Sequence, residues 1–213
     1  MDVTKLTRPA RKLLPLKTCG AVIVAAGSAS RMGGIDKVMA PLGGEPMIVR
    51  TVRAFQNCDA IASIVIVTRE DLIRPISGLC RDMSKVTAVV CGGSSRQESV
   101  HLGLNALPKG TKLAAVHDGA RPLVSWQVID RAVRAANTYG GAAPAIPVKD
   151  TIKVVKGGLV ESTPDRASLQ AVQTPQVFDF DLLRGALKKA EEDKAQVTDD
   201  CSAVERLGMK IKI

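Results

Sequence analysis

Short apolar runs alternate with amphipathic segments through the first two thirds of the chain. The apolar runs cover residues 21–24, 61–68, 86–91 and 113–117, and they are rich in Val, Ile and Ala. An extended chain of this composition is apolar on both faces, as in the buried strands of parallel sheets. We therefore expect four buried, parallel strands in this region.

Helix signals lie between these runs. Pro46 suits the first position of one helix. Ser95 and Glu98 have the spacing of a capping box, and Ser125 can cap a third helix. Strand and helix alternate in units of about 25 to 35 residues, which is typical of a doubly wound, mostly parallel α/β sheet with helices on both faces.

The pattern changes after Tyr139. Residues 151–155 and 159–163 flank the turn sequence Lys156-Gly157-Gly158, which predicts an antiparallel β-hairpin within a segment of residues 148–168. Because an isolated hairpin is marginally stable in water, it needs something to pack on. It is an active-site flap, an arm that grips a second subunit, or a surface decoration.

The last part of the chain returns to a helical pattern. We expect helices over residues 181–189 and 198–207, with Gly208 as a C-cap. Residues 209–213 look like the beginning of a strand, and no polar tail follows them. We therefore expect that a C-terminal segment is missing from this chain.

Length and charge limit the class of protein. A chain of 213 residues fits one domain, which we expect over residues 18–213 behind a basic N-terminal extension, residues 1–17. The net charge of +9 favours anionic partners. Three Phe, one Tyr and one Trp are too few for a platform that stacks bases, so small phosphates are favoured over nucleic acid.

The cysteines indicate a compartment. Five cysteines are widely spaced and form no C-x-x-C pair, and only two histidines accompany them. This pattern predicts free thiols in a reducing compartment, so we expect a cytoplasmic protein. No apolar run approaches the length of a membrane span, and no membrane partner is expected.

The stretch "AAGSASRMGGIDK", residues 25–37, follows the first predicted strand. Loops at the carboxyl ends of parallel strands bind ligands, and Gly27 would let a phosphate approach the backbone closely. Arg31 and Lys37 supply one bidentate and one point-like cation for phosphate. The alternative is a flexible turn carrying two solvated cations.

Two more strand ends carry polar residues. The sequence "GGSSRQESV", residues 92–100, offers glycine N–H groups and hydroxyls for an anion or a nucleotide edge, although helix capping explains Ser95 and Glu98 equally well. In "HDGARP", residues 117–122, Asp118 is placed to hold Mg²⁺ or another divalent cation, or it simply begins a turn. We expect His117 to be a packed core histidine.

The sequence carries no motif for an enzyme nucleophile, neither a nucleophile elbow nor a Ser/His/Asp set. An ionised phosphate that attacks needs no general base, because its second pKa is near 6. Catalysis then consists of positioning and charge neutralisation, for which an Arg, a Lys and a magnesium-binding Asp suffice.

Taken in order, these motifs resemble a known family. "AAGSASRM", "GGSSRQESV", "HDGARP", "VKDTIK", "DR" followed by "QTPQ", and "VTDD" are similar to motifs of the 2-C-methyl-D-erythritol 4-phosphate cytidylyltransferases. These are CTP-dependent enzymes of the non-mevalonate isoprenoid pathway. The resemblance runs from about residue 21 to residue 208 and implies a Rossmann-like fold whose β-arm joins two copies into a homodimer.

The resemblance also implies roles for residues. Those implied for CTP binding are Ala25, Ala26, Gly27, Gly93, Ser94, Ser99 and Asp118, with Asp118 also holding Mg²⁺. Arg31 and Lys37 are implied to stabilise the transition state, and Arg166 to orient the attacking phosphate. The pocket for the polyol phosphate is implied to contain Arg121, Thr151, Thr174 and Thr198.

This chain departs from the family pattern in a few places. Ala29 and Gly119 are mild changes, but Asp36 precedes Lys37 where Pro is common, and it can pair with Lys37 and weaken its hold on phosphate. A further phosphate-facing Lys of the family has no clear counterpart here. Two alternatives stay open: a cytidylyltransferase for ribitol 5-phosphate or another polyol phosphate, and a non-catalytic phosphate- or nucleic-acid-binding module.

Overall fold

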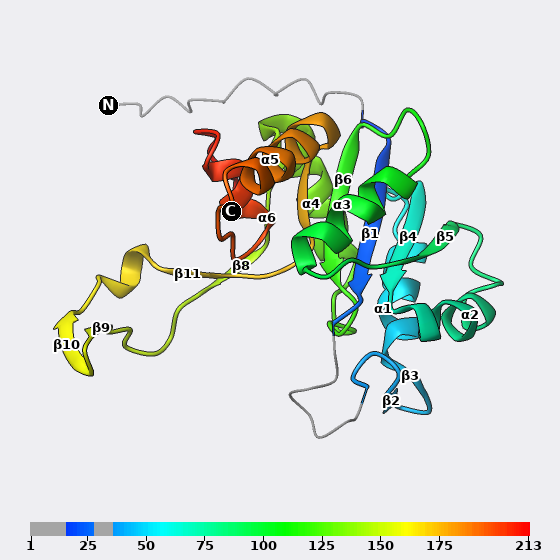
Figure 1. Ribbon diagram of the computed structural model, residues 1–213, viewed down its shortest axis with the longest axis horizontal. Helices are drawn as coiled ribbons and strands as arrows, with labels where there is room; N and C mark the ends of the chain where they lie inside the picture. The colour runs from blue at the N-terminus through cyan, green and yellow to red at the C-terminus, as the bar shows by residue number, and fades with distance from the viewer. Residues whose placement is uncertain (1–15, 28–35) are drawn as a thin grey trace, which may run out of the picture.

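The computed structural model describes residues 16–27 and 36–213, and Arg31 therefore lies outside the described residues. Over these residues the core is a six-stranded sheet in the order β5-β4-β1-β6-β12-β7 (Figure 1). Its strands are β1 (Cys19–Ala25), β4 (Ser63–Thr68), β5 (Val86–Cys91), β6 (Leu113–Asp118), β7 (Gly141–Ala142) and β12 (Gln176–Asp179). The four predicted strands are confirmed, and β5, β4, β1 and β6 are parallel.

Helices cover both faces of this sheet, as the pattern predicts. The helices are α1 (Met47–Gln56), α2 (Glu70–Leu79), α3 (Arg96–Ala106), α4 (Trp126–Tyr139), α5 (Phe180–Glu192) and α6 (Asp200–Glu205). Ile23 of β1 packs with α1, α2 and α4 on one face, whereas Val22 packs with α3, α5 and α6 on the other. The alternation of side chains along a strand thus divides the core into two layers.

The order in which the chain forms the strands indicates where a ligand would bind. From β1 the chain passes to β4 and β5 on one side and then crosses to β6 on the other side of β1. Strand order therefore reverses between β1 and β6, and ligands of open α/β sheets bind outside the carboxyl ends at such a reversal.

Some elements were not predicted. The pattern missed α2, because Pro75 inside it argues against a helix. It also missed β12, which inserts antiparallel between β6 and the edge strand β7. The prediction that Pro46 begins a helix was wrong by one residue, since Pro46 closes the short hairpin of β2 (Pro41–Leu42) and β3 (Glu45–Pro46) and precedes α1.

A long arm leaves the body of the molecule after β7 (Figure 1). Its stem is the pair β8 (Ala145–Pro147) and β11 (Gln170–Val172), and its tip is the antiparallel hairpin of β9 (Val154–Lys156) and β10 (Leu159–Ser162). Gly157 and Gly158 both have positive φ, +57° and +81°, which a two-residue hairpin turn of this type requires. A 3₁₀ turn, η2 (Arg166–Ser168), lies on the return path. The predicted hairpin is confirmed, although residues 151–153 lie outside it.

The C-terminal predictions need correction at their edges. Helix α6 begins at Asp200 and ends at Glu205, shorter than the predicted 198–207, because Asp199 caps it with its side chain. Gly208 has φ of +78°, as expected after a helix. Lys212 then pairs with Ala142 of β7, so the last residues do extend the sheet edge. Over the described residues, no helix combines the length and apolar character needed to cross a bilayer.

Candidate functional site

Four parallel strands end at one edge of the sheet, and their register places their last residues side by side. Ala25 of β1 pairs with Thr68 of β4, which in turn pairs with Cys91 of β5. On the other side, Val24 pairs with Asp118 of β6. The three loops that the sequence singled out therefore emerge next to one another, around the β1–β6 reversal.

Small residues let these loops pack closely. A Cβ at Gly92 would collide with the Cβ of Ala26, so glycine is required for the loop after β5 to lie against the loop after β1. The N–H of Gly92 donates to the carbonyl of Thr68 (2.8 Å), and the N–H of Gly119 donates to the carbonyl of Val24 (2.7 Å). Backbone hydrogen bonds thus tie the end of β5 to that of β4 and the end of β6 to that of β1.

The loop between β5 and α3 is organised by its own side chains. The N–H of Gly93 donates to Ser99 Oγ (3.1 Å), and both the N–H and the hydroxyl of Ser94 donate to Glu98 Oε2 (2.7 Å each). These bonds to Ser94 lower the pKa of the Glu98 carboxyl. Because an ionised carboxylate repels phosphate, the loop suits the uncharged parts of a nucleotide better than its triphosphate.

Asp118, at the end of β6, lies between two arginines. Its Oδ2 accepts from Arg121 Nε at 2.8 Å, and its Oδ1 lies 3.8 Å from Arg96 Nη2. Arg96, at the start of α3, also donates to Asp200 Oδ2 at 2.7 Å. Burial disfavours the charged form of Arg96, but the surrounding carboxylates, above all Asp200, outweigh it and raise its pKa. The cluster is a fixed array of alternating charges.

Asp118 is the candidate ligand for a divalent cation. Within residues 16–27 and 36–213, no group of three or more His, Cys, Asp or Glu side chains is gathered for a metal. Mg²⁺ that is bound with a nucleotide needs only one or two carboxylates, since phosphate oxygens and waters complete its octahedron. The partly exposed carboxylate of Asp118 fits that requirement.

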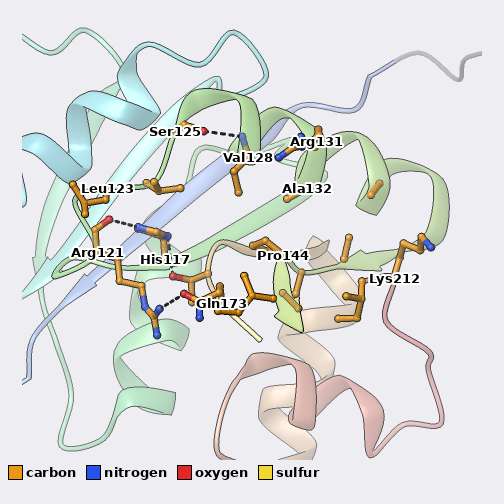
Figure 2. Close-up of a pocket in the computed structure, with 18 of the residues that line it drawn as sticks. His117, Arg121, Leu123, Ser125, Val128, Arg131, Ala132, Pro144, Gln173 and Lys212 are labelled. Carbon is orange, nitrogen blue, oxygen red and sulfur yellow. Dashed lines mark hydrogen bonds between the residues drawn. The ribbon is translucent and has the colours of Figure 1, made fainter. Parts of the chain in front are cut away.

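His117 is buried beneath Asp118, as predicted, and it also forms hydrogen bonds. Its Nδ1 is 2.9 Å from Thr174 Oγ1, and its Nε2 is 3.2 Å from the carbonyl of Arg121 (Figure 2). Burial lowers the pKa of His117 to about 4. In the neutral ring that this implies, Nε2–H donates to the carbonyl and Nδ1 accepts from the threonine hydroxyl. His117 thereby fixes both Thr174 and the loop that carries Arg121.

Thr174 was expected to bind substrate, but its side chain already has hydrogen-bond partners within the protein. Its side chain is buried, and its oxygen lies 3.4 Å from the N–H of Asp118 while its proton faces His117. Thr198 differs, since it lies exposed just before α6 and its N–H donates to Ser202 Oγ (3.2 Å). Gln176 joins the two regions by bonding Asp199 Oδ2 (2.8 Å) and the N–H of Cys201 (2.9 Å).

A cleft of about 840 Å³ opens beside this cluster (Figure 2). Its walls come from α4 on one side and from β7, β8 and the C-terminal residues on the other. Arg121, Gln173 and Thr174 lie at one end, where Arg121 Nη1 donates to Gln173 Oε1 at 2.6 Å. The predicted polyol-pocket residues Arg121 and Thr174 therefore line a cleft that adjoins Asp118.

Asp36 and Lys37 lie just before the short strand β2. The carboxylate of Asp36 accepts from the N–H of Val38 (3.1 Å) and lies 2.7 Å from Arg69 Nη2. Lys37 is exposed, and within the described parts of the chain its ammonium has no hydrogen bond or ion pair. The expected pairing of Asp36 with Lys37 is therefore not observed.

Thr151 and Arg166 are not brought to this site. Both belong to the arm, which projects away from the edge of the sheet in Figure 1. Thr151 is exposed in the loop before β9, and Arg166 donates from Nη1 to the carbonyl of Lys149 at 2.8 Å. Within one copy of the chain, these two residues stay apart from Asp118.

The sequence missed several residues that build the site. These are Arg96, which faces Asp118; Asp200, which binds Arg96; His117, which bonds Thr174; and Gln176, which bonds Asp199 and the N–H of Cys201. Arg96 and Asp200 do occur in the motifs "GGSSRQESV" and "VTDD", but their spacing of more than a hundred residues gave no sign that they pair.

Comparison with known proteins gives one consistent result. The family model for 2-C-methyl-D-erythritol 4-phosphate cytidylyltransferase matches residues 19–213. A protein of that name from Symbiobacterium thermophilum is 44% identical over 194 residues, which cover 90% of this chain and 81% of the relative. Another, from Geobacillus thermodenitrificans, is 44% identical over 197 residues, covering 91% and 86%.

Solved structures give the same result at lower identity. The crystal structure of the 4-diphosphocytidyl-2C-methyl-D-erythritol synthase of Anaerococcus prevotii superimposes with a TM-score of 0.83 at 30% identity. The match covers 92% of this chain and 86% of that one.

Proposed function

The chain belongs to the 2-C-methyl-D-erythritol 4-phosphate cytidylyltransferase family, and from this we propose how its site carries out the family's reaction. A phosphate oxygen of 2-C-methyl-D-erythritol 4-phosphate attacks the α-phosphorus of CTP in line. The new P–O bond forms as the bond from the α-phosphorus to the bridging oxygen breaks, and pyrophosphate leaves. The products are 4-diphosphocytidyl-2-C-methyl-D-erythritol and pyrophosphate.

The observation that carries this proposal is the meeting of three loops at the β1–β6 reversal. We assign the triphosphate to the backbone of Ala25, Ala26 and Gly27, which ends β1 beside Asp118. The cytidine then lies on the loop of Gly93, Ser94 and Ser99, where Glu98 makes phosphate binding unfavourable. This orientation directs the α-phosphate toward the side of the site nearest Lys37, whose neighbour Asp36 contacts Arg69 directly after β4.

Arg31 and Lys37 are the proposed stabilisers of the pentavalent transition state. Charge accumulates on the oxygens of the α-phosphorus during an in-line displacement, and fixed cations lower the energy of that arrangement. Lys37 is exposed, and none of its three ammonium N–H groups has a partner among the described residues, which supports a role in binding phosphate. The attacking phosphate is already ionised, so no residue is needed as a base.

Asp118 is the residue proposed to hold Mg²⁺. The cation, when bound, neutralises phosphate charge and helps to orient the triphosphate. Arg121 Nε donates to Oδ2 of Asp118, whereas Arg96 lies 3.8 Å from Oδ1, too far for a hydrogen bond, so Oδ1 is the oxygen better placed to bind a cation. The carboxylate is thus oriented before any ligand arrives.

We place the polyol phosphate at the Arg121 and Thr174 end of the cleft. Thr198 is assigned to the same pocket by the family pattern, since it does not line the cleft itself. Arg166 and Thr151 of the partner subunit complete this pocket, because the arm carries them away from their own body. The arm supports a homodimer in another way. Its tip exposes Leu159 (76%) and Val160 (60%), which would be unfavourable on a monomer in water.

The reaction is tested by measuring pyrophosphate release. Release is expected with CTP and 2-C-methyl-D-erythritol 4-phosphate, and it should be much slower with UTP, ATP or GTP, or with ribitol 5-phosphate as acceptor. Equal rates with the two acceptors would contradict the substrate assignment. The five cysteines are all free thiols, which supports the cytoplasm as the place where the enzyme works.

A further inference from the structure

Residues 36–40 form one turn held by Asp36. The carbonyl of Asp36 accepts from the N–H groups of Met39 (3.2 Å) and Ala40 (2.9 Å), and its side chain accepts from the N–H of Val38. An aspartate in this position caps a helical turn. Lys37 is the first residue inside that turn, so the backbone direction at Lys37 is set by Asp36.

Arg69 connects this turn to the sheet. It directly follows β4, whose last residue, Thr68, pairs with Ala25 at the floor of the site. Its guanidinium binds Asp71 through two bonds (3.1 and 3.0 Å) and contacts Asp36 at 2.7 Å. The contact with Asp36 is the shorter one, and the exposed carboxylate of Asp71 lies outside the turn.

The contact between Asp36 and Arg69 also sets the net charge beside Lys37. The side chains of Asp36 and Arg69 are both partly buried, at 21% and 31% exposed, so they are less screened than a surface pair. Because Arg69 neutralises the Asp36 carboxylate, that carboxylate does not compete with phosphate for the neighbouring ammonium. A carboxylate that would otherwise weaken the binding of phosphate by Lys37 instead holds the backbone turn that carries Lys37.

We propose that Asp36 and Arg69 form a positioning pair that orients Lys37 toward the reacting phosphate. The inference rests on the proposed role of Lys37 in cytidylyl transfer. Asp36 and Arg69 do not touch substrate in this proposal, and they act only through the placement of the turn. Their effect therefore belongs in kcat, where the transition state is stabilised, and not in the binding of either substrate.

The test is a kinetic cycle between Asp36→Ala and Lys37→Ala in the full chain. Asp36→Ala is expected to lower kcat by about tenfold, less than removal of Lys37 does, because a misplaced cation retains part of its effect. The KM values for both substrates should change by less than about twofold. In the Lys37→Ala background, the same Asp36→Ala change should have no further effect on kcat.

Two variants separate the cap from the ion pair. Asp36→Asn keeps an acceptor for the N–H of Val38 but loses the charge, and Arg69→Ala removes the cation that Asp36 contacts. The kcat of each variant should lie between that of wild type and that of Asp36→Ala. Asp71→Ala is the matched control, since Asp71 binds Arg69 but makes no contact with the turn. Its kcat should stay within about twofold of wild type, because one exposed ion pair contributes little.

The outcomes are distinguishable. If Asp36→Ala has normal or increased kcat, or lowers it equally in the Lys37→Ala background, the positioning role is overturned. If wild type releases no pyrophosphate from CTP and the methylerythritol phosphate, or Lys37→Ala is as fast as wild type, the proposed function itself fails. The midpoint of thermal unfolding of each variant shows whether a loss of rate comes from a loss of fold.

Discussion

Arg96 and Asp200 form an ion pair of 2.7 Å across the site, between the first residues of α3 and α6. Asp200 is 1% exposed, and its second oxygen, Oδ1, has no partner among the described residues. Arg96 also faces Asp118, the proposed metal ligand, at 3.8 Å. The pair therefore links the end of the chain to the centre of the site.

Removal of Asp200 should be costly because it leaves a partly buried guanidinium without its main partner. We expect Asp200→Ala to lower the free energy of unfolding by about 3 kcal/mol, the lower end for a broken buried pair because Arg96 is one-third exposed. Urea denaturation measures this value. The double variant Arg96→Leu with Asp200→Leu should recover part of the stability but none of the activity. Full stability in Asp200→Ala would contradict the buried pair.

Removal of either proposed cation should slow the chemical step. Lys37→Ala and Arg31→Ala are each expected to lower kcat by about 10² to 10³, which corresponds to about 2.7 to 4 kcal/mol for a preorganised charge. Pyrophosphate release under saturating substrates gives kcat, and the midpoint of thermal unfolding controls for the fold. Near-normal turnover in either variant would remove that residue from the transition state.

His117 should make the stability of the protein depend on pH. Its pKa falls from 6.5 to about 4 in the folded protein because burial disfavours the charged ring, while Asp118 and Arg121 act in opposite directions. Between these values the unfolded chain binds the extra proton, so stability is lost as pH falls from about 6.5 to about 4. The loss amounts to about 3 kcal/mol.

The control for this prediction is His117→Gln, which cannot titrate. Urea unfolding of the ligand-free protein at several pH values should show a weaker pH dependence in this variant, by the amount given above. The carboxyl groups of the chain titrate in both proteins, so their contributions to the pH dependence of stability cancel in the comparison. Parallel stability profiles for the two proteins would show that His117 does not titrate in this window.

The arm should assemble a dimer. Leu159→Asp together with Val155→Asp places charge on its exposed apolar residues and should yield a monomer in analytical ultracentrifugation. The far-ultraviolet circular dichroism should not change, because neither side chain contributes to the core of its own subunit. Glu161→Ala, on the same hairpin, is the matched control and should remain dimeric.

A mixture of two inactive variants tests whether the arm completes the site of its partner. Lys37→Ala and Arg166→Ala subunits are each inactive, but a mixed dimer would contain one site with both defects and one with neither. Random exchange of subunits should then restore about a quarter of wild-type activity, since half of the dimers are mixed and half of their sites are intact. Activity no higher than that of the separate variants would place Arg166 in the site of its own chain.

The sequence alone determined the strands of the parallel sheet, the hairpin at Gly157-Gly158 and the loops that end β1, β5 and β6. These features depend on local order, because apolar periodicity, caps and glycine turns act over a few residues. The family pattern in those loops was likewise visible in order along the chain. Helix α2 escaped because Pro75 contradicts a helix locally, while the packing of Ile76 against the sheet overrides that preference.

Only the tertiary structure decided which polar residues meet. Arg96 and Asp200 are far apart in sequence, and Asp36 finds Arg69 rather than the adjacent Lys37, because the parallel register brings strand ends and helix starts together. The geometry of the sheet edge and the free-energy cost of burying an unpaired charge decide which charged residues pair. Neither can be read from the spacing of residues along the chain.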